Sequence, residues 1–243
     1  MEKNKEKLGI KTCSLALIDL GLNLRNVRLI ARLDIKGPNL IKGINLEGLR
    51  IIGNPNDFAV KYYEEGVDEI IFMDTVASLY GRNNLTEVVE KASRNIFIPI
   101  TVGGGVRSVS DAYHLLRAGA DKIAINSTAT QDPTLIEKLA NEFGSQAITA
   151  SIEVSRDSTN FLRVLRNNGR DETGLEAVSW AKQCETLGAG EILLTSVNNE
   201  GTRRGFDINL ISEITNNVSI PVIASGGMGE KKHALDASII GGA

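Results

Sequence analysis

The segment GVDEIIFMD at residues 66–74 recurs as GAGEILLTS at residues 188–196, a shift of 122 positions. A second segment repeats with the same shift, because IPITVGGG at 98–105 corresponds to IPVIASGG at 220–227. Self-similarity at one fixed spacing indicates that the chain consists of two related halves.

Short apolar and β-branched runs alternate with amphipathic stretches along both halves. The runs that predict strands are residues 27–34, 68–74, 97–102, 121–126, 146–153, 190–196 and 220–225. Strands that alternate with helices favour parallel βαβ units with right-handed crossovers. The sequence therefore predicts an α/β fold, a (β/α)8 TIM barrel built from two half-barrel repeats.

The repeat also predicts the limits of the barrel. The counterpart of the strand at 121–126 falls beyond Ala243, so we expect a barrel that is truncated before strand 8. We expect residues 1–26 to be a poorly ordered amino-terminal extension, and residues 27–243 to form the barrel domain without its last βα unit. Two strands would then have unpaired edges.

Composition narrows the class of ligand. The chain has 243 residues and a net charge of −3 with no basic patch, which argues against nucleic-acid binding, and no apolar run is long enough to span a membrane. Cys13 and Cys184 form no disulfide framework, which indicates the cytoplasm. His114 and His233 both lie in predicted helices, which argues against a metal site. We expect a small-molecule ligand and no cofactor.

Two carboxylates occupy matching positions in the repeat. Asp34 ends the first strand of the first half, and Glu153 ends the first strand of the second half. The carboxyl ends of the strands carry the active site in TIM barrels, where a facing pair of acids can transfer protons. A strand-end acid is also often a helix cap or part of a structural ion pair. We predict that Asp34 and Glu153 are catalytic.

Glycine clusters follow two strands that the repeat relates, at 103–105 and 226–229. Glycine lets backbone N–H groups approach an anion closely, although each cluster is equally compatible with a tight βα turn. Two such clusters favour a substrate with two phosphates.

The glycine-rich segment 35–55 is long for a connection, which predicts a lid over the site. Its Lys42 either covers an anionic substrate or is solvated.

Ordered motifs along the chain, among them RLDIKGPNLIKG at 32–43, TVGGGVRS at 101–108 and EGTRRGFD at 200–207, give it a specific resemblance. From Val27 to Ala243 it resembles the cyclase subunit of imidazole glycerol phosphate synthase. The resemblance implies a lyase of histidine biosynthesis that forms a heterodimer with a glutaminase (glutamine amidotransferase) subunit. With ammonia from that partner, the family converts a bisphosphorylated ribulosyl formimino carboxamide nucleotide to imidazole glycerol phosphate and aminoimidazole carboxamide ribonucleotide.

The resemblance also implies roles for individual residues. Asp34 falls on the first catalytic aspartate of the family, and Glu153 falls on the second catalytic position. The resemblance implies that the substrate and its phosphates are bound by Lys42, Gly104, Gly105, Asn126, Ser127, Thr195, Glu200, Gly201, Gly226 and Gly227. It also implies that the charged gate through which ammonia enters consists of Arg28, Glu69, Lys122 and Glu191.

Three departures from the family pattern keep other functions open. Glu153 and Glu200 replace aspartates, and Arg32 replaces a small residue on the same strand face as Asp34. These changes resemble a paralogous branch that is associated with surface polysaccharide biosynthesis, in which ammonia is supplied for the formation of an acetamidino sugar. A third possibility is a non-catalytic barrel that only docks the glutaminase.

Overall fold

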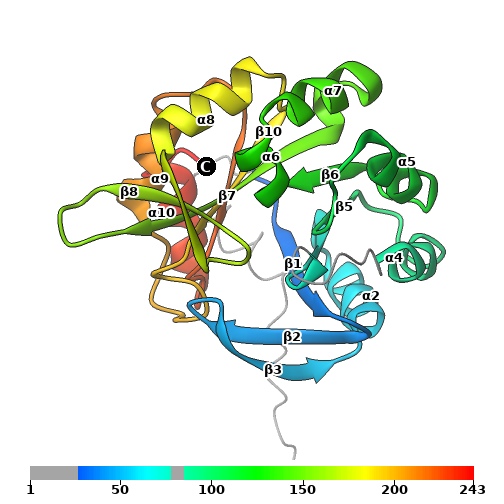
Figure 1. Cartoon of the computed structure of the whole chain (residues 1–243). Helices are drawn as coiled ribbons and strands as arrows, with labels where there is room; N and C mark the ends of the chain where they lie inside the picture. Colours follow the sequence, from blue (N-terminus) through cyan, green and yellow to red (C-terminus); the bar gives the residue numbers. More distant parts are fainter. Residues whose placement is uncertain (1–26, 78–84) are drawn as a thin grey trace, which may run out of the picture.

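The computed structural model describes residues 27–77 and 85–243, in which helices surround a curled parallel sheet (Figure 1). The parallel strands lie in the order β11-β10-β7-β6-β5-β4-β1. They are β1 Ile30–Lys36, β4 Glu69–Asp74, β5 Ile100–Gly103, β6 Lys122–Ile125, β7 Ile148–Arg156, β10 Glu191–Ser196 and β11 Val222–Ser225. Each matches one predicted strand, which confirms the TIM-barrel prediction.

Helices connect these strands and cover their outer side (Figure 1). They are α2 Pro55–Glu65, α4 Leu85–Ser93, α5 Val109–Arg117, α6 Ser127–Gln131, α7 Thr134–Phe143, the 3-10 turn η2 Ser145–Ala147, α8 Ala177–Thr186, α9 Ile208–Thr215 and α10 Lys231–Ile239. His114 lies in α5 and His233 in α10, as predicted. The Nδ1 atom of His233 accepts a hydrogen bond from the N–H of Gly229 (3.1 Å), so this histidine caps the start of its helix.

Each barrel strand contributes alternate residues to two cores. In β4, Ile70 and Phe72 pack outward in the large apolar cluster between sheet and helices. Ile71 and Met73 point inward and form a smaller cluster with Leu193 inside the barrel. Because both faces of the strands are buried, the strands are continuous apolar runs in the sequence.

Within the described residues, the barrel is open between β11 and β1. Strand β11 pairs with β10 alone, and β1 pairs with β4 and with the antiparallel strand β2 Asn39–Ile44. A cavity of about 730 Å³ lies at this opening, lined by both strands through residues such as Ile30 and Val222. None of the helices in the described parts of the chain is long and apolar enough to cross a membrane.

The glycine-rich segment after β1 forms a β-hairpin, where the sequence predicted a loop. Strands β2 Asn39–Ile44 and β3 Glu47–Gly53 pair antiparallel. The turn between them consists of Asn45 and Leu46, which both have positive φ (53° and 63°). A two-residue turn with two positive φ angles matches the twist of paired strands. Leucine rarely adopts this conformation, so the sequence carried only half of the usual turn signal.

A second hairpin, absent from the prediction, follows β7. Strands β8 Leu162–Arg166 and β9 Asp171–Glu176 pair antiparallel, with Asn167 and Asn168 at positive φ (55° and 60°) in the connection. These two residues lie 122 positions after the turn residues of the first hairpin. The two hairpins are therefore copies of one element, and the internal repeat extends to them.

The two hairpin turns contact one another over the mouth of the barrel. The Asn168 side chain donates a hydrogen bond to the carbonyl oxygen of Leu46 (3.3 Å). The first turn also reaches the loop after β10, because the N–H of Asn45 donates to the carbonyl oxygen of Glu200 (2.7 Å). The segment 35–55 thus lies across the carboxyl ends of the strands, where the sequence analysis expected a lid.

Gly190, just before β10, is required by close packing. A Cβ atom at Gly190 would lie 2.2 Å from the carbonyl oxygen of Ser145. We expect Gly190→Ala to lower the free energy of unfolding by about 3 kcal/mol, measured by urea denaturation, because the backbone has to shift. Gly48→Ala is the control, since no heavy atom lies within 4 Å of a Cβ there and only its positive φ costs about 1 kcal/mol. Equal losses would contradict the steric explanation.

Candidate active site

The predicted acids lie at the carboxyl-terminal mouth of the barrel, and both are buried. Asp34 in β1 is 7% exposed and Glu153 in β7 is 6% exposed. Glu153 accepts a hydrogen bond from the backbone N–H of Gly169 (2.8 Å), which lies just after the turn residues of the second hairpin. Asp34 is close enough for its charge to raise the pKa of Glu153. The structure therefore places both acids at the same mouth of the barrel, within range of each other's charge.

Burial raises the pKa of Glu153 above its ordinary value. Three neighbours act to lower this pKa but do not outweigh burial. They are the charge of Arg32, the hydrogen bond from the N–H of Gly169 and a hydrogen bond from the Asn126 side chain. A carboxyl group with a raised pKa holds its proton to higher pH, so Glu153 is suited to donate one.

Arg32 lies beside Asp34 on the inward face of β1. Its Nε atom donates to Oδ1 of Asp34 (2.9 Å), and its Nη1 atom donates to the hydroxyls of Thr195 (2.8 Å) and Ser225 (3.3 Å). Although burial acts to lower it, the charges of Asp34, Glu200 and Glu153 hold the pKa of Arg32 above its ordinary value. The mouth therefore contains a permanently charged guanidinium group whose side chain is 12% exposed.

The first glycine cluster borders a cavity of about 240 Å³. Its lining includes the predicted residues Gly104, Gly105, Asn126, Ser127 and Glu153. A Cβ atom at Gly104 would lie 2.3 Å from the carbonyl oxygen of Asp74, so only glycine fits this turn. The Oδ1 atom of Asn126 is buried without a hydrogen-bond partner among the described residues. A buried acceptor of this kind fits a ligand that donates a hydrogen bond.

The second glycine cluster borders a larger cavity of about 850 Å³. Its lining includes the predicted residues Lys42, Glu200, Gly201, Gly226 and Gly227, together with Arg32 and Ser225. The ammonium group of Lys42 forms an ion pair with the buried carboxylate of Glu200. The first hairpin thus places Lys42 over the mouth, and Thr195 lies buried behind Arg32.

The predicted gate residues gather at the opposite end, where the strands begin. Glu191 accepts hydrogen bonds from Arg28 (2.8 Å) and Lys122 (2.9 Å). Glu69 forms ion pairs with the same two cations. Although burial acts to raise it, the bonds from Arg28 and Lys122 hold the pKa of Glu191 below its ordinary value. The four side chains form one closed network of alternating charge.

Some residues of the mouth were not predicted. Ser225 and the hairpin residues Asn167 and Asn168 line the two cavities. The Asn167-Asn168-Gly169 run was a readable turn signal, whereas nothing in the sequence distinguished Ser225. Among residues 27–77 and 85–243 no group of three potential ligands could hold a metal ion.

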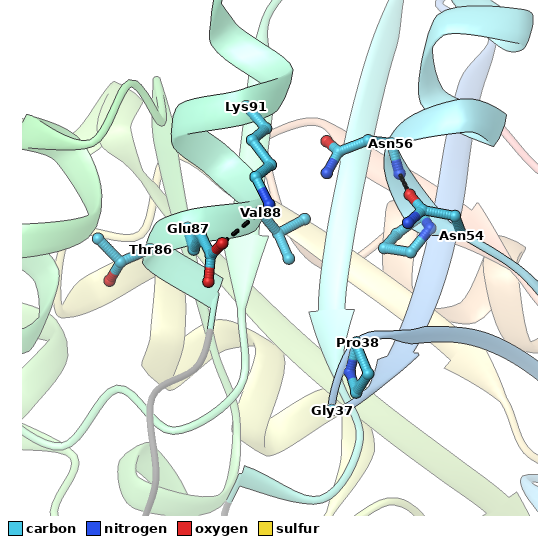
Figure 2. Close-up of a pocket in the computed structure, with 9 residues that line it drawn as sticks. Gly37, Pro38, Asn54, Asn56, Thr86, Glu87, Val88 and Lys91 are labelled. Atoms are coloured by element: carbon cyan, nitrogen blue, oxygen red, sulfur yellow. Dashed lines mark hydrogen bonds and ion pairs between the residues drawn. The ribbon is translucent and has the colours of Figure 1, made fainter.

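Another cavity, of about 460 Å³, lies outside the barrel and contains none of the predicted residues (Figure 2). It lies between the turn after β1 and the starts of α2 and α4, and its lining includes Gly37, Asn54 and Lys91. Figure 2 shows that Lys91 points toward Glu87, with which it forms an ion pair at 2.8 Å. Because its one lysine is already paired and no buried acid lines it, this cavity lacks the chemistry of the mouth.

The fold and the site together define a TIM-barrel protein whose functional groups gather at the carboxyl ends of the strands. Comparison with known proteins refines this class. Residues 28–241 match the family described as "Histidine biosynthesis protein". The imidazole glycerol phosphate synthase subunit HisF of Legionella pneumophila is 62% identical over 207 residues, which cover 85% of this chain and 98% of that relative. HisF of Bacillus cereus strain Q1 is 48% identical over 209 residues, or 86% of this chain and 83% of that relative.

The chain therefore belongs to the histidine biosynthesis family and, within it, to the HisF subunits of imidazole glycerol phosphate synthase.

Glu153 makes stability depend on pH in a defined direction. Because its folded pKa is raised, its contribution is fully present below the unfolded pKa, near 4.5, and is lost as pH rises to the folded value. Glu153→Gln stays neutral at every pH. We therefore expect the stability of Glu153→Gln, relative to the parent, to increase by about 1.4 kcal/mol for each pH unit between the two pKa values and then to level off.

Chemical denaturation between about pH 3 and 9 measures this difference. The control is Glu87→Gln. Because the hydrogen bond from Lys91 lowers the pKa of Glu87 from its ordinary value of 4.5, the stability of this variant relative to the parent should change only below that pH, and in the opposite direction. A difference between Glu153→Gln and the parent that does not change with pH would contradict a protonated Glu153.

Proposed function

We propose that this chain is an active cyclase, a lyase that uses ammonia to split a bisphosphorylated ribulosyl formimino carboxamide nucleotide and close an imidazole ring. The observation that carries the proposal is the placement of two glycine-lined cavities around one acid pair. Glu153 lines one cavity, and Arg32, bonded to Asp34, lines the other. A substrate with a phosphate at each end fits this arrangement, with its reacting centre between the acids.

The two acids are assigned different parts in proton transfer. Neutral Glu153 donates a proton to the leaving group, and Asp34, held by Arg32, accepts a proton from the attacking nitrogen. Pairs of acids in different environments divide the acid and base roles in this way. Glycine N–H groups at Gly105 and Gly227 hold the phosphates, with Ser127 and Lys42 beside them.

The two glutamates that replace aspartates are accommodated by specific contacts. Glu153 is held by the N–H of Gly169, and Glu200 is held by Lys42. A misplacement of about 1 Å can lower a rate on the order of a hundredfold, so such anchoring favours retained catalysis over a barrel that only docks a partner.

The partner that fits the other face is a glutaminase, in a heterodimer. The network of Arg28, Glu69, Lys122 and Glu191 surrounds the axis of the barrel where the strands begin. Buried charges of this kind are costly and have to be paired or functional. Ammonia released by the partner enters here and reaches the acid pair through the barrel. The cytoplasm is the compartment that fits a chain with no disulfide framework.

Arg32 favours a second candidate function. Its guanidinium group adds a permanent positive charge beside Asp34. Such a charge fits the paralogous branch that supplies ammonia for acetamidino-sugar formation. The two functions share ammonia and the glutaminase and differ in the electrophile. Turnover of a nucleotide sugar, with none of the ribulosyl nucleotide, would decide for the second.

Asp34→Asn tests the proposed reaction. An amide keeps the shape of the carboxylate but cannot accept a proton, so we expect ammonia-dependent turnover to fall by about a hundredfold or more while the substrate dissociation constant changes little. Turnover is measured with ammonium salt and no glutaminase. Unchanged turnover would remove Asp34 from the mechanism.

The partner proposal is tested by adding the candidate glutaminase. We expect a one-to-one complex in size-exclusion chromatography and faster glutamine hydrolysis in its presence. Lys122→Met should slow glutamine-dependent turnover more than ammonium-dependent turnover, because it opens the charged network without touching the mouth. Equal effects on both activities, or no complex at micromolar concentrations, would contradict the proposed gate.

A further inference from the structure

Arg32 has hydrogen-bonding capacity that the protein itself does not use. A guanidinium group carries five N–H donors. One, on Nε, is directed at Asp34, and two, on Nη1, are directed at the hydroxyls of Thr195 and Ser225. The Nη2 atom has no hydrogen-bond partner among the described residues, and it is not among the buried polar atoms that lack one. Its two donors are therefore accessible from the cavity that Arg32 lines.

The neighbours of Arg32 fix its position before any ligand binds. Asp34 balances its charge, and the two hydroxyls hold the plane of the guanidinium group. The side chain is 12% exposed, so its charge is largely shielded from water, and charged hydrogen bonds are stronger there than in bulk solvent. An arginine held in this way loses little conformational freedom when it binds an anion.

The other cations around the same cavity are placed differently. Lys42 is 48% exposed and is already paired with Glu200, and Arg50 and Arg203 are exposed at the rim. Gly226 and Gly227 contribute only neutral backbone groups. Among the residues that the structure describes, Arg32 is therefore the least exposed cation of this cavity.

We propose that Arg32 binds a phosphate oxygen of the substrate in the cavity of Gly226 and Gly227, and that this contact selects for a phosphorylated substrate. The inference rests on the proposed function, because it assigns the charged contact at one of its two phosphate positions. The ligand chemistry is a phosphate monoester or a diphosphate, and both present oxygens that the two Nη2 donors can reach.

Titration calorimetry of the full chain with inorganic phosphate tests the contact. The parent has two glycine-lined cavities, so we expect two binding events. Arg32→Met keeps an apolar stem and removes the charge, and it should weaken one event by about ten- to a hundredfold while the other is unchanged. Arg32→Lys keeps the charge without the planar fork and should give an intermediate loss. Arg204→Ala, which removes an exposed arginine of the nearby loop, is the charge-matched control and should bind like the parent.

Circular dichroism confirms that each variant is folded before it is titrated. Pyrophosphate in a parallel titration distinguishes the two sources of the phosphate. Tighter binding of pyrophosphate that also depends on Arg32 assigns a diphosphate, and tighter binding of phosphate assigns a monoester. Phosphate binding by Arg32→Met within twofold of the parent at both positions, or no saturable binding by the parent at millimolar concentrations, overturns the inference.

The titration is independent of turnover. If phosphate binding depends on Arg32 but no ammonia-dependent turnover occurs, the inference stands and the proposed reaction fails. If turnover occurs and Arg32→Met binds phosphate as the parent does, the reaction stands and the inference fails.

Discussion

The parallel register of the barrel strands is the constraint on which the arrangement of charges depends. Ile30 of β1 lies opposite Glu69 of β4, and Thr149 of β7 lies opposite Glu191 of β10, so these neighbouring strands begin close to the same level. All inward-facing residues near the strand starts therefore meet at one end, and those near the strand ends meet at the other. A slip of one residue in any strand would turn these side chains into the outer core.

Charge pairing differs between the two ends. At the strand starts, two carboxylates face two cations, and Thr149 adds a hydrogen bond to Glu191 (3.1 Å). At the mouth, Arg32 pairs with Asp34 and Lys42 pairs with Glu200, while Glu153 forms no direct ion pair among the described residues. The network at the strand starts is internally satisfied, and the mouth retains a protonatable acid. The difference fits a structural or gating role at one end and proton transfer at the other.

The sequence predicted much of this arrangement, because the repeat marks strand ends directly. All seven barrel strands and the placement of Asp34 and Glu153 at one mouth of the barrel followed from it, and the residues predicted to bind substrate line the two cavities, apart from Thr195 behind Arg32. The hairpins were missed because β3 is mostly exposed and shows no apolar alternation, and because Leu46 is an unusual turn residue. The contacts of Arg32 with Thr195 and Ser225 could not be predicted, since they join residues more than 160 positions apart.

The contact between the two hairpin turns has a consequence for the evolution of the chain. Leu46 and Asn168 are copies of the same ancestral position, and they touch each other. A duplicated residue that does not touch its copy can change independently of it. Where a residue touches its own copy in the other half, a substitution of that residue alters the surroundings of the copy. The two halves therefore remain coupled at this contact over the mouth.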